Sequence, residues 1–158
     1  MLVNRSMPPS AVIPILIYED PDEAVDWLCD AFGFSVRWRA GEHRAQLAVG
    51  HDGAVVVGER RIVPADASSD LTIFRPPRRG EVSHAIIVRV DDVDSHYARA
   101  REGGARIVRR PEDYPYGERQ YSAEDLEGHR WTFSQTIADA APEDWGATSS
   151  AIDELRPG

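Results

Sequence analysis

Two stretches of similar order decide the fold, VIPILIYEDPD at residues 12–22 and HAIIVRVDDVD at residues 84–94. Each is a β-rich run that closes on acidic residues, and Asp20 aligns with Asp92 at an offset of 72 positions. Both runs lead into a helical pattern that ends at glycine, at Gly33 in the first copy and at Gly103 in the second. The chain therefore contains an internal repeat that begins with a strand and a helix.

The helix of the first copy has clear signals at both ends. Asp20 is the expected N-cap, Pro21 the first helical residue, and Glu23 the acceptor that completes a capping box. Gly33 supplies the left-handed stop. The apolar residues between them recur at helical spacing, at Ala24, Trp27, Leu28, Ala31 and Phe32. In the second copy we expect a helix from the cap Asp92 to the glycines at 103–104.

After each helix the apolar period changes to two, which is typical of strands. The first copy predicts strands over 36–39, 45–49 and 54–57, and the second over 105–108, 119–123 and 129–134, with turns at 50–53 and 125–128. Each half is thus β-α-β-β-β, and the fold class is α+β. We divide one compact domain into a first module at 11–59, a connector at 60–82, a second module at 83–137 and a tail at 138–158.

The connector and the tail have no sustained period. The connector contains five arginines and three prolines, and we expect a solvated surface linker, although its arginines could also grip an anionic ligand. In the tail, Trp145 is the one residue that we expect to dock on the body of the protein.

Composition excludes several functions. The formal net charge is −9, which argues against a nucleic-acid partner. All 18 basic residues are arginine, so Schiff-base and phosphate-loop lysines are absent. The single cysteine, Cys29, cannot form an internal disulfide, and we expect a reducing, cytoplasmic location. The longest apolar stretch, 11–18, has eight residues, whereas a bilayer span needs about 20, and residues 1–10 lack a signal-peptide pattern.

The doubled β-α-β-β-β order resembles the vicinal oxygen chelate superfamily, which includes glyoxalase I, bleomycin-resistance proteins and extradiol dioxygenases. The resemblance covers residues 12–134 and is most specific in HAIIVRVDDVDSHYARAREGGARIV and YPYGERQYSAEDLEGHRWTF of the second half, which look like the glyoxalase-like branch. It implies two modules that form an open half-barrel of mixed sheet, with helices on the convex side and a ligand cleft on the concave side. It also implies a homodimer.

Metal-using members of this superfamily hold a divalent ion by residues of the first and last strands of each module. With the turn glycines Gly53 and Gly128 aligned, those positions are Val12, Val57, His84 and Thr132. Only His84 is a good donor, whereas a catalytic site needs about three protein ligands. Glu59 lies two residues beyond Val57 and would add a donor only in a different register.

We therefore expect no tightly bound catalytic metal, with His84 and Glu59 as weak candidates. The alternatives are a neutral strand histidine at position 84 and a strand-end surface acid at position 59. His43, His51, His96 and His129 form no metal spacing and are expected at loop, helix-surface or strand-end positions.

Strand alternation identifies candidates for the cleft lining. If Thr132 faces the cleft, so do Arg130 and Ser134, while Trp131 and Phe133 point into the core. Arg130 is either an anchor for a carboxylate or a paired structural arginine. The segment 114–121, YPYGERQY, either forms an aromatic rim or shapes a turn that covers the sheet edge. The predicted ligand-binding residues are His84, Tyr116, Arg119, Tyr121, Arg130 and Thr132.

Two functions remain open from the sequence. The first is a glyoxalase-like or bleomycin-resistance-like protein that binds an aromatic or polar small molecule between its modules without a metal. The alternative is a metal-dependent lyase, isomerase or dioxygenase that acts on a substrate with vicinal oxygens, and it requires His84, Glu59 and a third donor such as Gln46 or His43 to converge.

Overall fold

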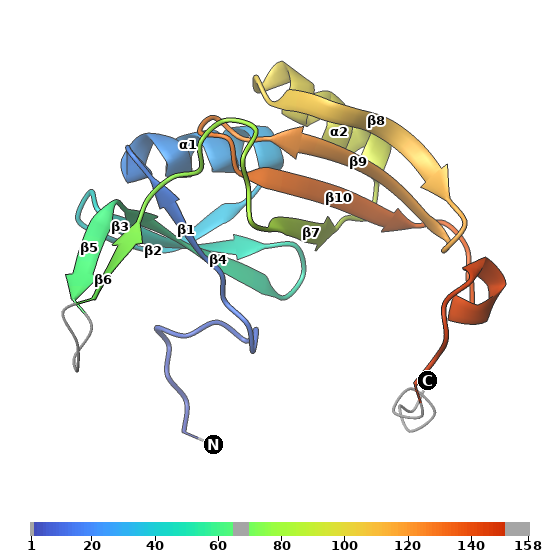
Figure 1. Ribbon diagram of the computed structural model, residues 1–158, viewed down its shortest axis with the longest axis horizontal. Helices are drawn as coiled ribbons and strands as arrows, with labels where there is room; N and C mark the ends of the chain where they lie inside the picture. The colour runs from blue at the N-terminus through green and yellow to red at the C-terminus, as the bar shows by residue number, and fades with distance from the viewer. Residues whose placement is uncertain (1, 65–69, 151–158) are drawn as a thin grey trace.

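The computed structural model describes residues 2–64 and 70–150 and has the expected α+β architecture (Figure 1). In the first half, α1 (Pro21–Phe32) packs on a sheet of β1 (Ile15–Tyr18), β2 (Ser35–Ala40), β3 (Arg44–Val49) and β4 (Gly53–Glu59). The strand order is β1-β4-β3-β2, with β1 parallel to β4.

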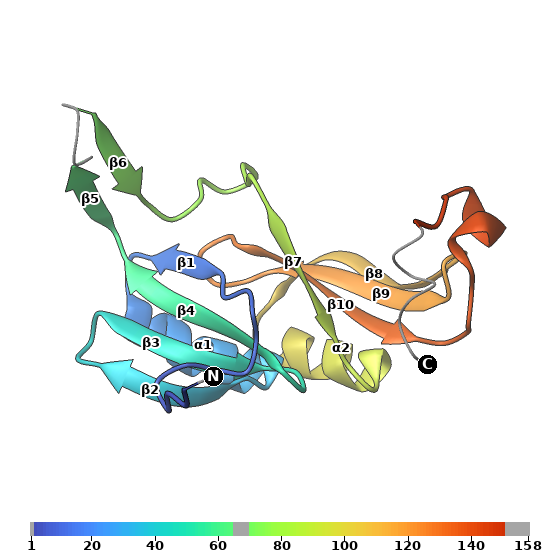
Figure 2. The same cartoon turned by 90° about the horizontal axis from the view of Figure 1, so that it is seen from below.

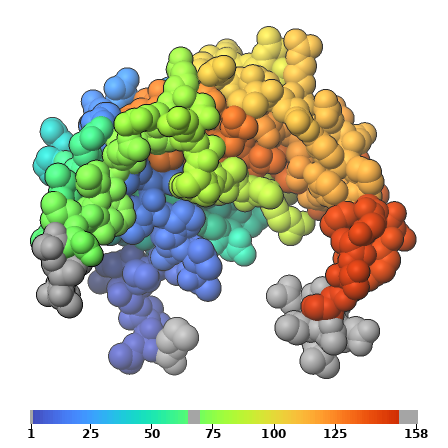
Figure 3. All heavy atoms as spheres, viewed as in Figure 1, coloured from blue at the N-terminus to red at the C-terminus, as the bar shows by residue number. Residues whose placement is uncertain are grey.

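The second half repeats this arrangement. Helix α2 (Val93–Glu102) accompanies β7 (Ala85–Arg89), β8 (Arg106–Tyr114), β9 (Glu118–Glu124) and β10 (Arg130–Thr136). Their order is β7-β10-β9-β8, with β7 parallel to β10, so the internal repeat is confirmed. The two mixed sheets form an open half-barrel, and space-filling atoms show a hollowed side between the N-terminal segment (blue) and the segment 138–150 (red-orange) (Figure 3).

The helix ends confirm the predicted caps Asp20, Gly33 and Asp92, but not the part of the capping box expected from Glu23, because the Asp20 amide donates to Glu127 instead. The Asp20 side chain accepts a hydrogen bond from the Glu23 amide at 3.0 Å, and Gly33 ends α1 in the left-handed region at φ 74°. The Asp92 side chain accepts from the Ser95 amide at 3.0 Å. Neither described helix is long and apolar enough to span a membrane.

The connector differs from a plain surface linker. Residues Arg61–Pro64 (β5) and Leu71–Phe74 (β6) pair as an antiparallel ribbon, which projects from the body of the protein (Figure 2). The alternation in LTIF favours a strand, and the prediction missed it because this run is only four residues long. The tip of the ribbon, 65–69, lies outside the described residues.

The tail contacts the body of the protein through Trp145, which remains 43% exposed. A short 3-10 helix, η1 (Pro142–Trp145), brings the Trp145 ring to 5.6 Å from the Tyr116 ring. The end of the tail, 151–158, lies outside the described residues.

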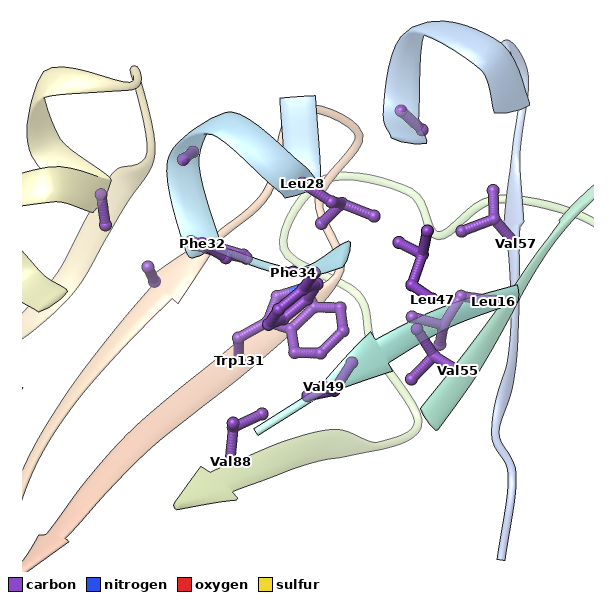
Figure 4. Close-up of a cluster of buried hydrophobic side chains, with 14 of the residues drawn as sticks. Leu16, Leu28, Phe32, Phe34, Leu47, Val49, Val55, Val57, Val88 and Trp131 are labelled. Carbon is purple, nitrogen blue, oxygen red and sulfur yellow. The ribbon is translucent and has the colours of Figure 1, made fainter. Parts of the chain in front are cut away.

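The two modules share one hydrophobic core (Figure 4). The Phe32 ring of α1 lies 4.8 Å from Phe133 and 5.7 Å from Trp131, both in β10 of the other module. Both β10 side chains are fully buried, as strand alternation predicted. Since α1 of one half covers aromatic residues of the other, neither half completes its core alone.

A buried carboxylate, Asp125, also joins the modules. Its Oδ2 accepts hydrogen bonds from the Tyr18 hydroxyl at 2.5 Å and from Trp131 Nε1 at 3.0 Å. Its Oδ1 accepts from the amides of Glu127 and His129 at 3.1 and 3.0 Å. Burial and the adjacent Asp125 raise the pKa of Tyr18 well above its usual value, so the hydroxyl keeps the proton it donates.

The turn that contains Asp125 also forms hydrogen bonds with the end of β1 and the residues after it through two other side chains. The Glu127 carboxylate accepts hydrogen bonds from the amides of Glu19 and Asp20, at 2.6 and 3.3 Å. His129 Nε2 donates to the Ile17 carbonyl at 2.7 Å. The turn of the second module thereby satisfies backbone groups at the start of α1 in the first.

His96 was expected on a helix surface, and the structure corrects this. Its ring packs 4.0 Å from the Phe133 ring, and Nε2 donates to the Phe32 carbonyl at 2.8 Å. Its Nδ1 then accepts from the Tyr121 hydroxyl at 2.6 Å. The sequence pattern missed this because α2 packs against α1 on the face that carries His96, a contact with no local signal.

We predict that Asp125→Ala lowers the free energy of unfolding by about 3 kcal/mol or more, because two side-chain and two backbone donors lose their acceptor. Tyr18→Phe removes one of these bonds and should cost about 1 kcal/mol. Urea denaturation measures both, with the exposed Asp139→Ala as the control. An Asp125→Ala variant as stable as that control would contradict the assigned role.

We also predict that stability falls as pH drops below about 6.5, the usual pKa of histidine. Burial lowers the pKa of His96 in the folded protein. Between the lowered pKa and the unfolded value, the unfolded chain binds a proton that the folded chain does not, so acid favours unfolding.

Urea denaturation at several pH values between 5 and 7.5 tests this. His96→Asn should flatten the slope of stability against pH relative to the wild type. Equal slopes in the wild type and His96→Asn would refute the assignment.

Candidate functional site

The concave face of the second sheet carries a continuous polar surface. Strands β9 and β10 pair in a register that places Ser122 opposite Thr132 and Gln120 opposite Ser134. Successive strand residues point to opposite faces, so these four side chains lie on the face away from Trp131 and Phe133. We call them the polar row.

The members of the polar row bond to one another. The Ser122 and Thr132 hydroxyls lie 2.9 Å apart. Gln120 Nε2 donates to Ser134 Oγ at 3.0 Å, and the Tyr116 hydroxyl donates to Gln120 Oε1 at 2.9 Å. Tyr116 therefore stands at one end of the row. Thr132 is on the concave face, as predicted.

An ionic group lies at the other end of the row. Glu124 is only 5% exposed, and its carboxylate is 3.2 Å from Arg106 and 3.6 Å from Arg130. Arg130 Nε is buried and has no hydrogen-bond partner among the described residues. Arg130 is thus a paired structural arginine that retains one unused donor.

Two predicted ligand residues lie on the opposite face. Tyr121 is fully buried against Phe133, and burial raises the pKa of its hydroxyl, which donates to His96. Arg119 pairs with Asp94 of α2 at 3.0 Å and with Asp113 at 2.9 Å. Tyr121 faces the core because it lies opposite Phe133 in the register. Arg119 is on the same face because it lies two residues before Tyr121 in β9.

The sequence of β9 did contain a pattern that indicates which of its residues lie on the concave face. In β9 the apolar Tyr121 and Ala123 alternate with Gln120, Ser122 and Glu124. The apolar members of such a strand belong to the core, so the polar members are the ones that face outward. In β9 the prediction chose Tyr121 and missed Gln120 and Ser122.

A hollow lies at the junction of the modules, between the β3–β4 turn and the edge strand β7. Its volume is about 600 Å³. Val12 and Pro14 of the segment before β1 and Ile87 of β7 give it apolar walls. His51 and Asp91 lie at its polar part, 3.1 Å apart across the two modules.

His84 lies just before β7 and outside the polar row. Its ring centroid is 6.5 Å from that of His129, and its Nδ1 is 3.4 Å from Ser83 Oγ. These neighbours supply no carboxylate. The contacts given for His84 are with Ser83 and His129, and they do not include Thr132 or Tyr116.

Of the two first-half metal positions, Val12 lines the hollow but offers no donor atom, and Val57 does not face it. Val57 is fully buried beside Leu16, on the helix-covered side of the sheet. The glycine alignment was wrong because Gly53 is already part of β4, whereas Gly128 lies in the turn before β10. The alignment therefore places Val57, a core residue, opposite Thr132, which is on the concave face.

The remaining donors do not converge. Glu59 bonds His43 Nδ1 at 2.9 Å, and Gln46 accepts from Arg37. Within 2–64 and 70–150, no three histidine, cysteine, aspartate or glutamate side chains are grouped to hold an ion. The donor set present does not fit a catalytic divalent metal, which needs about three protein ligands.

Comparison with known proteins supports the architecture. TioX from Micromonospora sp. ML1 is 35% identical, with a TM-score of 0.62 over 84% of this chain and 100% of that chain. A lactoylglutathione lyase from Agrobacterium tumefaciens shares the fold at 19% identity and a TM-score of 0.57, over 82% of this chain and 96% of its own.

An uncharacterised protein of Mycobacterium tuberculosis strain H37Rv is 26% identical over 89% of this chain and 83% of its own length. Residues 11–133 match the sequence pattern of the Glyoxalase/Bleomycin resistance protein/Dioxygenase superfamily. The match spans both modules and the connector between them. The chain belongs to the glyoxalase/bleomycin resistance protein/dioxygenase superfamily.

Proposed function

We propose that this protein binds a small organic molecule on its concave side, between the modules, without a catalytic metal. The observation that carries the proposal is the junction hollow of about 600 Å³. Binding sites for small molecules usually measure about 300 to 1,000 Å³ and combine apolar walls with a few polar groups. The proposal includes a cytosolic location, because the chain has a single cysteine.

The hollow and the polar row adjoin each other. Ile87, which lines the hollow and is 65% exposed, pairs in register with Thr132 of the row. A ligand seated against Ile87 thus reaches the Thr132 hydroxyl across one strand spacing of about 4.8 Å, and the Ser122 hydroxyl lies one strand further. This combination suits an aromatic or aliphatic body with a hydrogen-bonding substituent.

A metal-dependent lyase, isomerase or dioxygenase is the rival function. It needs His84 to join other donors, and the neighbours of His84 are Ser83 and His129 rather than Glu59. Metal analysis of dialysed protein separates the two functions. One equivalent of metal per chain that is lost in His84→Ala would establish the rival.

We expect a further feature, a homodimer. The free edge strands β1 and β7 carry exposed apolar side chains, among them Ile15 and Ile87. Free strand edges with apolar residues are suited to pairing with a second chain, and most soluble oligomers are two-fold dimers.

For the binding proposal, we predict that Ile87→Arg weakens binding at least tenfold, because the long side chain fills the hollow. The probe is anilinonaphthalene sulfonate fluorescence, followed by a thermal-shift series of aromatic antibiotics and metabolites. The control is Ile62→Arg, which changes a similarly exposed isoleucine on the projecting ribbon. Equal binding by wild type and Ile87→Arg, with the molar mass unchanged, would refute a ligand in this hollow.

For the dimer, light scattering after size exclusion should give about twice the chain mass of 17.6 kDa. Ile15→Arg places a charge on the β1 edge and should shift the protein toward the monomer. A wild-type mass of one chain at micromolar concentration would exclude the dimer.

A further inference from the structure

A second hollow, of about 390 Å³, lies where the connector crosses the second module. Its connector side is the run Arg75-Pro76-Pro77-Arg78. The two prolines restrict the backbone between the arginines. Pro76 is buried, and Pro77 packs close to Gly128 of the β9–β10 turn. The connector is thus held against the turn, with both arginines at the hollow.

The floor of this hollow contributes two histidines. His84 is exposed there, whereas His129 is only 7% exposed. His129 Nε2 donates its proton to the Ile17 carbonyl, so Nδ1 of the neutral ring is an acceptor and His129 shapes the floor without donating to an anion. Ser83 adds a hydroxyl group, and Glu81 is the one acidic residue of the lining.

The arginines of the hollow form no ion pair with residues 2–64 or 70–150. Arg60, Arg119 and Arg130 each make an ion pair, but Arg75 and Arg78 make none within the part of the chain that the structure describes. A guanidinium group binds carboxylate or phosphate through two parallel hydrogen bonds. Both guanidinium groups are available for such a contact.

The charge distribution sets this region apart. Residues 60–82 contain five arginines against three acidic residues, whereas the rest of the chain contains 13 arginines against 24 acidic residues. A local positive hollow on an acidic protein is not explained by solubility, which net charge of either sign provides. It concentrates anions where the bulk of the surface repels them.

We propose that this hollow binds an oxyanion group, a carboxylate or a phosphate, between Arg75 and Arg78 of the connector and the donors Ser83 and His84 that precede β7. The site is separate from the junction hollow. This proposal does not depend on the binding of a small molecule in the junction hollow.

Calorimetric titration of the full chain at low ionic strength tests the site, with inorganic phosphate and benzoate as the two probes. Arg75→Gln/Arg78→Gln should lower the association constant of the bound probe at least tenfold. Arg79→Gln/Arg110→Gln removes two exposed arginines that do not line the hollow and should change it less than twofold. Melting temperatures and circular dichroism confirm that each variant is folded.

The probes identify the anion. Binding of phosphate alone assigns a phosphate site, binding of benzoate alone assigns a carboxylate site, and binding of both assigns a general oxyanion site. The proposal is overturned if wild type binds neither probe, if the hollow variant binds as wild type does, or if the control variant loses as much affinity.

Discussion

The rest of the structure depends on the buried carboxylate of Asp125. It lies in a turn of the second module, and one of its four hydrogen-bond donors is Tyr18 of the first. A buried charge is tolerated only when hydrogen bonds replace its hydration. The modules must therefore dock in one orientation for the carboxylate to be satisfied. The neighbouring contacts of Glu127 and His129 with β1 reinforce that orientation.

The position of this joint determines which surfaces remain open. The Asp125 contacts and the aromatic contacts of Phe32 lie on the helix-covered side of the sheets. Together they hold the modules from the convex side, with His96 completing the contact between α2 and α1. On the concave side the modules also meet at the exposed His51–Asp91 pair, which lies outside this joint. The other concave residues can thus vary with the ligand while the assembly of the two halves is preserved.

Local chemistry made the fold predictable, and long-range register limited the prediction of the site. Asp20, Gly33 and the burial of Trp131 follow from capping and alternation, which act within a few residues. The face of Tyr121 depends on its pairing with Phe133, and the face of Val57 on where β4 begins after its turn. Asp125 was recognised as part of a turn, but Tyr18 is 107 residues away in the sequence. No local pattern indicates such a partner.

The internal bonds of the polar row also bear on how a ligand is selected. The Ser122, Thr132, Gln120 and Ser134 side chains already satisfy one another. A ligand that bonds to them exchanges one hydrogen bond for another, and such exchanges contribute only about 1 kcal/mol each. Affinity must then come from apolar contact in the hollow, at Ile87, Val12 and Pro14. A ligand that fits these apolar walls gains affinity without breaking the hydrogen bonds of the row.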